Sequence, residues 1–104
     1  QFMYSHDLAY IIKQCLDNDI YDSFNVATKE IHSIDEIARI ALKACYADDL
    51  EIIYDSSKPD GQFRKDVSIE KLEKTIPDFV QTSLFDGIRN TYEYLMQNKT
   101  LLTK

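Results

Sequence analysis

The strongest constraint on the fold of this chain is the alternation of helical apolar spacing with two short β-branched runs. Near the start, apolar residues recur at intervals of three and four, the period of a helix with one buried face; they are Leu8, Ile11, Ile12, Cys15 and Leu16. The same spacing recurs at 33–46 and 83–96, and more briefly at 68–76. Between these segments, residues 24–28 ("FNVAT") and 50–55 ("LEIIYD") have the composition of short buried strands.

The helix starts carry recognisable capping residues. Ser33 with Glu36 three residues later forms a capping box in front of the second helix. The other starts are assigned to Ser5 or Asp7, to Ser68 and to Ser83. The short third helix has to stop before Pro77, because proline disfavours helical backbone in its predecessor. Residues 99–104 are predicted to be a frayed tail.

The order helix, strand, helix, strand, loop, helix, helix predicts an α/β fold with about four helices and two or three short strands. With 104 residues, the chain is expected to form one domain, 1–104. The run 24–28 is too short to make a stable sheet with a single partner. The chain also starts inside an apolar and aromatic run, "QFMYSHDL", which reads as a fragment whose upstream part is absent.

The acidic composition narrows the classes of partner. A formal charge of -6 and a pI near 4.7 argue against binding to nucleic acid or to an anionic membrane surface. The sequence has no apolar run of about 18 residues and no signal-peptide pattern, so the cytoplasm is the expected compartment. Cys15 and Cys45 are interpreted as reduced core thiols, and His6 and His32 have no partner at metal-ligand spacing, so we expect no metal site.

The segment "YDSSKPDGQFRK", residues 54–65, contains a tyrosine and a lysine at a catalytic-looking spacing. Tyr54 and Lys58 lie four apart, as in the catalytic pair of short-chain dehydrogenases, but that pair needs a helix to bring both side chains to one face. Pro59 makes Lys58 extended, and extended residues four apart are roughly 13 Å from each other. We therefore predict no catalytic residue here.

The same segment is better interpreted as a ligand-binding loop. Residues 58–61, Lys-Pro-Asp-Gly, fit a type I turn. Three cations, Lys58, Arg64 and Lys65, face one anion, Asp60, in a chain that is otherwise acidic. Guanidinium and ammonium groups are the usual ligands of phosphate. The alternative is a solvated, charged turn without a ligand.

Four stretches together resemble the C-terminal part of the GDP-L-fucose synthase family and related extended short-chain dehydrogenase/reductase epimerases. They are "QFMYSHDLA", "FNVATKEIHSIDEIA", "YDSSKPDGQFRKDVSIEKL" and "IPDFVQTSLFDGIRNTYEYLMQN". The third is the most specific, since it is similar to the family's Asp-x-(Ser/Thr)-Lys-Pro-Asp-Gly run. The resemblance covers nearly the whole chain.

This resemblance implies a substrate-binding role in an enzyme that epimerises and then reduces GDP-4-keto-6-deoxy-mannose with NADPH. Family members carry the NADP site and the catalytic residues in an upstream Rossmann half, so no cofactor is expected in this chain. By resemblance, Arg64 would contact the pyrophosphate of the sugar nucleotide. Lys58, Asp60, Gly61 and Lys65 would lie near it. The intact enzyme is expected to be a homodimer, and the Rossmann half is the expected protein partner.

Two other functions stay open on the sequence alone. One is another NAD-dependent sugar-nucleotide epimerase or dehydratase of the same superfamily, which would differ in substrate. The other is a stand-alone, non-catalytic interaction module that uses its helical faces to bind a protein.

Overall fold

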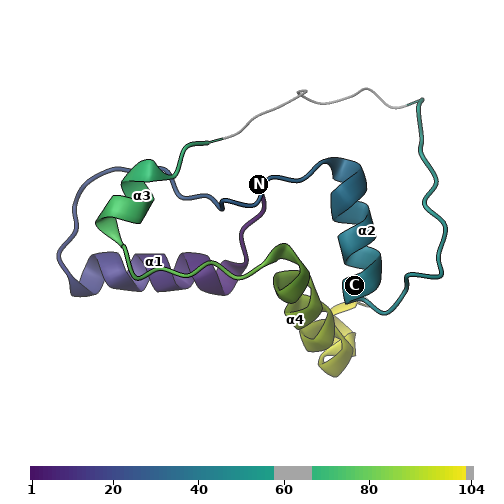
Figure 1. Ribbon diagram of the computed structural model, residues 1–104. Helices are drawn as coiled ribbons and strands as arrows, with labels where there is room; N and C mark the ends of the chain where they lie inside the picture. Colours follow the sequence, from purple (N-terminus) through teal and green to yellow (C-terminus); the bar gives the residue numbers. More distant parts are fainter. Residues whose placement is uncertain (58–66, 103–104) are drawn as a thin grey trace.

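The computed structural model describes residues 1–57 and 67–102, and this part of the chain is helical. Its elements are α1 (Ser5–Asp17), α2 (Ile34–Ala44), α3 (Glu70–Thr75), α4 (Leu84–Gln97) and the 3-10 helix η1 (Lys99–Leu102). Figure 1 shows α1 beside α3 at one end of the molecule and α2 beside α4 at the other. None of the helices in the described part combines the length and hydropathy needed to cross a membrane.

The predicted α/β fold is wrong, because residues 1–57 and 67–102 contain no strand. The runs 24–28 and 50–55 lie outside the helices, as predicted, but neither forms a strand. Figure 1 shows them on different sides of the molecule, with α2 between them. A strand is stable only when a neighbour satisfies its backbone donors and acceptors. Local β-branched composition therefore could not produce a sheet here.

The helix predictions were accurate in position and mixed in their caps. Ser33 and Glu36 form the predicted capping box, and the Ser83 side chain accepts from the backbone of Asp86 at the start of α4. The cap predicted for α1 is wrong, since its N-cap residue is Tyr4 and has no capping side-chain bond. At α3 the N-cap residue is Ile69, but the predicted Ser68 does accept from the backbone N–H of Glu70, at 3.4 Å. The predicted frayed tail is wrong for 99–102, which form η1.

The buried core is small and lies between α1 and α3. Its members are Ile11, Leu72 and Ile76, with Met3, Cys15, Ile20, Phe24, Ile69 and Phe79 packed around them. Both cysteines are free thiols and half-buried, in partial agreement with the prediction. Asp7 is also buried, and its carboxylate accepts from the backbone N–H of Thr82 at 2.7 Å and from its hydroxyl at 2.8 Å. This contact fixes α1 to the segment that leads into α4.

The chain is open for its size. Its radius of gyration is 16.6 Å, where a compact domain of this length has about 13 Å. Its accessible surface is 8368 Å², where a folded monomer of this mass exposes about 6,000 Å². Many large apolar side chains are exposed, among them Leu16, Ile34, Ile53 and Val80. Much apolar surface is therefore left uncovered.

Candidate functional site

All five predicted ligand-binding residues lie outside the described residues. They are Lys58, Asp60, Gly61, Arg64 and Lys65, and they fall in the segment 58–66. The structure does describe the residues on both sides of that segment. The contacts of these flanking residues therefore define the surroundings of the candidate site.

The N-terminal end of the segment is attached to α2. The Tyr54 hydroxyl donates to Asp35 Oδ1, and Asp35 Oδ2 also accepts from Arg39 Nε at 2.8 Å. Asp55 Oδ1 then accepts from the backbone N–H of Ser57 at 3.0 Å, a local turn of the Asx type. These contacts set the position from which the candidate loop departs.

The Tyr54 phenol is hydrogen-bonded to the carboxylate of Asp35. Its hydrogen bond to Asp35 raises the pKa of the phenol above its ordinary value of 10.0. A catalytic phenol acid paired with a lysine needs the opposite shift, since nearby positive charge lowers its pKa. Lys58 lies outside the described residues, so the prediction that Tyr54 and Lys58 do not form a catalytic pair stays a prediction.

The C-terminal end of the segment is attached to the first residue of the chain. The Gln1 amide pairs with the backbone of Val67, accepting from its N–H at 2.7 Å and donating to its carbonyl at 3.1 Å. The same amide nitrogen donates to the carbonyl of Thr28 at 2.9 Å, and Thr28 is 2% exposed. Three segments distant in sequence therefore meet where the candidate loop ends.

A polar hollow of about 560 Å³ opens beside this meeting point. It is lined by Ser23, Phe24, Asn25, Ser68, Glu70, Lys71 and Lys74. The ammonium group of Lys71 donates to the carbonyl of Ser23 at 2.7 Å, which holds it at the rim. Sequence analysis did not identify this hollow. Its signal was a pair of lysines three apart on the short helix α3, which begins five residues after Lys65.

A second concavity, of about 530 Å³, is apolar and lies between the N-terminal segment, α2 and α4. Its walls include Phe2, Tyr4, Ile37, Leu84, Ile88 and Tyr92, and no charged side chain lines it. Gly87 sits at its floor, where an added Cβ would lie 3.3 Å from Cβ of Tyr4. The groove therefore has no cation for a diphosphate, and its polar lining includes Ser and Thr residues.

The described residues offer little that would hold a metal or a dinucleotide. Among the residues that the structure describes, no group of His, Cys, Asp and Glu is arranged to bind a metal ion. The sequence has two glycines, and Gly87 lies within α4 against Tyr4. A dinucleotide-binding turn needs several closely spaced glycines between a strand and a helix.

Comparison with known proteins finds GDP-L-fucose synthases among the relatives of this chain. The chain is 29% identical to a GDP-L-fucose synthase of Dictyostelium discoideum over 102 residues, and 31% identical to a probable GDP-L-fucose synthase of Drosophila melanogaster over 103 residues. Each match covers 94% of this chain and 31% of the relative. No family model and no solved structure matches the chain. The resemblance predicted from the motifs is thus confirmed: over nearly all of its length, the chain is similar to about one third of a GDP-L-fucose synthase.

Proposed function

We propose that this chain is the sugar-nucleotide-binding part of a GDP-L-fucose synthase-like enzyme, with the loop 58–65 as its phosphate contact. The observation that carries the proposal is the match to two proteins with that name over 94% of the chain. The matched region includes a run in which Lys58, Arg64 and Lys65 concentrate positive charge in a chain of net charge -6. Local cations are what an anionic ligand needs on an acidic protein.

Two features of the described residues support a binding role for this loop. On its N-terminal side, the Tyr54 hydroxyl donates to Asp35 on α2. On its C-terminal side, the Gln1 amide pairs with the backbone of Val67. Fixing the ends lowers the entropy that the loop loses when it closes on a ligand. The polar hollow with Lys71 and Lys74 adjoins the C-terminal end of the loop, so it extends the positive charge that a diphosphate would meet.

The remaining two thirds of a relative's length would supply what this chain lacks. We assign no proton or hydride transfer to these 104 residues, because they contain neither a helical Tyr-x-x-x-Lys nor a glycine-rich turn for NADP. The uncovered surface fits the same view. Large apolar side chains such as Ile53 and Val80, each 85% exposed, are available for a partner domain to cover. A Rossmann-type partner domain is the proposed occupant.

Weak binding is expected from the chain alone. Charge-assisted hydrogen bonds contribute about 1.5 to 3 kcal/mol each, so three cations supply at most roughly 9 kcal/mol. Association costs about 4 to 15 kcal/mol. The balance is about 5 kcal/mol at best, which corresponds to a dissociation constant near the millimolar range.

Titration of the 15N-labelled chain with GDP tests the proposal. We expect a millimolar dissociation constant, with amide shifts concentrated at 58–71. Arg64→Ala should abolish the shifts, and Lys13→Ala, the matched control on α1, should leave them unchanged, because Lys13 forms an exposed pair with Asp17. Shifts confined to the apolar groove, or none at all at high millimolar GDP, would contradict the assignment of the loop. A micromolar constant would contradict the need for a partner domain.

A further inference from the structure

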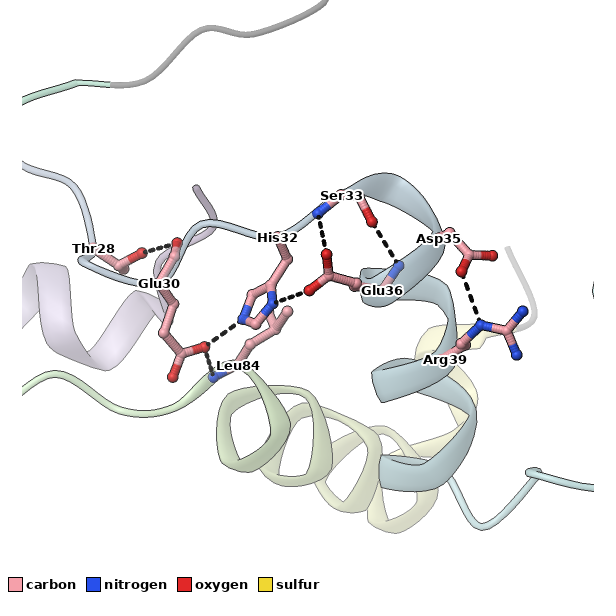
Figure 2. Close-up of polar contacts among 8 residues, drawn as sticks. All are labelled: Thr28, Glu30, His32, Ser33, Asp35, Glu36, Arg39 and Leu84. Carbon is pink, nitrogen blue, oxygen red and sulfur yellow. Dashed lines mark hydrogen bonds and ion pairs between the residues drawn. The ribbon is translucent and has the colours of Figure 1, made fainter.

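His32 lies between two carboxylates, one on each side of its ring (Figure 2). Its Nε2 is 3.0 Å from Glu30 Oε2, and its Nδ1 is 3.2 Å from Glu36 Oε2. An ionised carboxylate can only accept hydrogen bonds, and a neutral imidazole has only one N–H to donate. Both contacts are therefore satisfied together only when the ring is a doubly protonated imidazolium.

The two carboxylates connect the ring to the starts of α2 and α4 (Figure 2). Glu30 Oε2 also accepts from the backbone N–H of Leu84, the first residue of α4, at 3.0 Å. Glu36 belongs to the capping box of α2, in which its other oxygen accepts from the backbone N–H of Ser33 at 3.4 Å. A single ring thus joins two helix N-termini that lie about fifty residues apart in the sequence.

The charged groups around the His32 ring favour its protonated, cationic form. Glu30 comes from the segment ahead of α2, and Glu36 comes from α2 itself. From α4, the first turn offers the N–H of Leu84 and one acidic residue, Asp86. The nearby Asp35 is bound to Arg39 and Tyr54 instead. The His32 side chain is 24% exposed, so protons from solvent reach it.

We propose that His32 is a proton-operated clasp that holds the N-terminal ends of α2 and α4 together, and that loss of one ring proton opens it. Deprotonation of either nitrogen leaves a lone pair facing a carboxylate oxygen. That contact becomes repulsive, and the link from α2 through His32 and Glu30 to Leu84 is broken. The apolar groove, whose walls include Ile37 and Leu84, lies directly beside this link. The clasp is independent of the proposed ligand and acts on the stability of the chain.

The direction of the pH dependence follows from the two carboxylates. Hydrogen bonds that the ring donates to Glu30 and then to Glu36 raise the pKa of His32 above its ordinary value of 6.5. Because the folded pKa is the higher one, the stabilisation is fully present below about pH 6.5 and is lost as the pH rises through the folded pKa. In turn, the hydrogen bond from His32 lowers the pKa of Glu36 below its ordinary value of 4.5. The stabilisation contributed by the ionised Glu36 carboxylate is therefore lost as the pH falls through that lowered pKa.

The test combines thermal unfolding at several pH values with an NMR titration of the histidine rings. Between about pH 6.5 and 8.5, we expect the melting temperature of the chain to fall. His6→Gln is the matched control, since His6 is the other histidine and its ring lies 4.6 Å from that of Tyr4, at a tilt of 49°; this variant should keep the fall. His32→Gln should remove it, and Glu36→Gln should lower the midpoint at which His32 titrates.

Three results would overturn the clasp. One is a His32→Gln variant that keeps the pH-dependent fall in melting temperature. Another is a fall that disappears in His6→Gln. The third is a His32 ring in the unsubstituted chain that titrates at or below pH 6.5, a measurement that decides the question even where His32→Gln does not fold.

Discussion

Replacing Arg89 with alanine tests how α4 is fixed to the C-terminal end of α2. Arg89 Nε donates to the carbonyl of Ala44 at 2.9 Å, and Nη2 donates to that of Lys43 at 3.2 Å. These carbonyls lie in the last turn of α2, where backbone acceptors lack helical partners and the helix dipole is negative. The guanidinium carbon also lies 4.2 Å from the ring centre of Tyr46 and 4.7 Å from that of Phe85.

The size of the effect follows from these contacts. Hydrogen bonds from a charged donor contribute about 1.5 to 3 kcal/mol each, and a cation over an aromatic face adds about 0.5 to 1 kcal/mol at partly exposed sites. Because the contacts share one side chain, their sum overstates the loss. We expect Arg89→Ala to lower the free energy of unfolding by about 2 to 4 kcal/mol. Arg89→Lys should lose roughly half as much, since lysine keeps the charge without the planar fork.

Urea unfolding followed by circular dichroism at 222 nm measures this loss. Arg39→Ala is the matched control, because Arg39 forms an exposed i, i+4 pair with Asp35 on α2, and such pairs contribute little. Its unfolding midpoint should match that of the unsubstituted chain. The reasoning is refuted if Arg89→Ala changes the free energy of unfolding by less than about 0.5 kcal/mol, the range of ordinary surface substitutions.

Three further substitutions test the core, a buried polar contact and the proposed site. Leu72→Ala, at a residue 1% exposed, should cost about 2 to 5 kcal/mol in urea unfolding, whereas Leu16→Ala, at a residue 74% exposed, should cost less than about 0.5 kcal/mol. Asp7→Ala leaves two donors of Thr82 unpaired and should cost about 1 to 3 kcal/mol; a melting temperature unchanged by Asp7→Ala would contradict this. In a full-length synthase carrying this segment, Arg64→Ala should raise KM strongly with little change in kcat in steady-state assays, and a loss confined to kcat would argue against a phosphate contact.

The sequence alone predicted the helices well. Ser33 with Glu36, Ser83 and Pro77 marked two helix starts and one helix end correctly. This succeeded because helical hydrogen bonds join residues four apart, so composition and spacing within one segment contain most of the information. The resemblance of the segment 54–72 to GDP-L-fucose synthases was equally a property of consecutive residues.

Tertiary structure decided the features that join distant segments. Tyr46 adopts a left-handed backbone, with φ 58°, at a helix end that favours glycine, and its ring covers Arg89. Gln1 holds Val67, and His32 links α2 to α4 through Glu30. The absence of a sheet in the described residues has the same origin. A helix satisfies its backbone internally, whereas a strand, a buried carboxylate or a bridging ring depends on groups tens of residues away, which only the folded chain brings into contact.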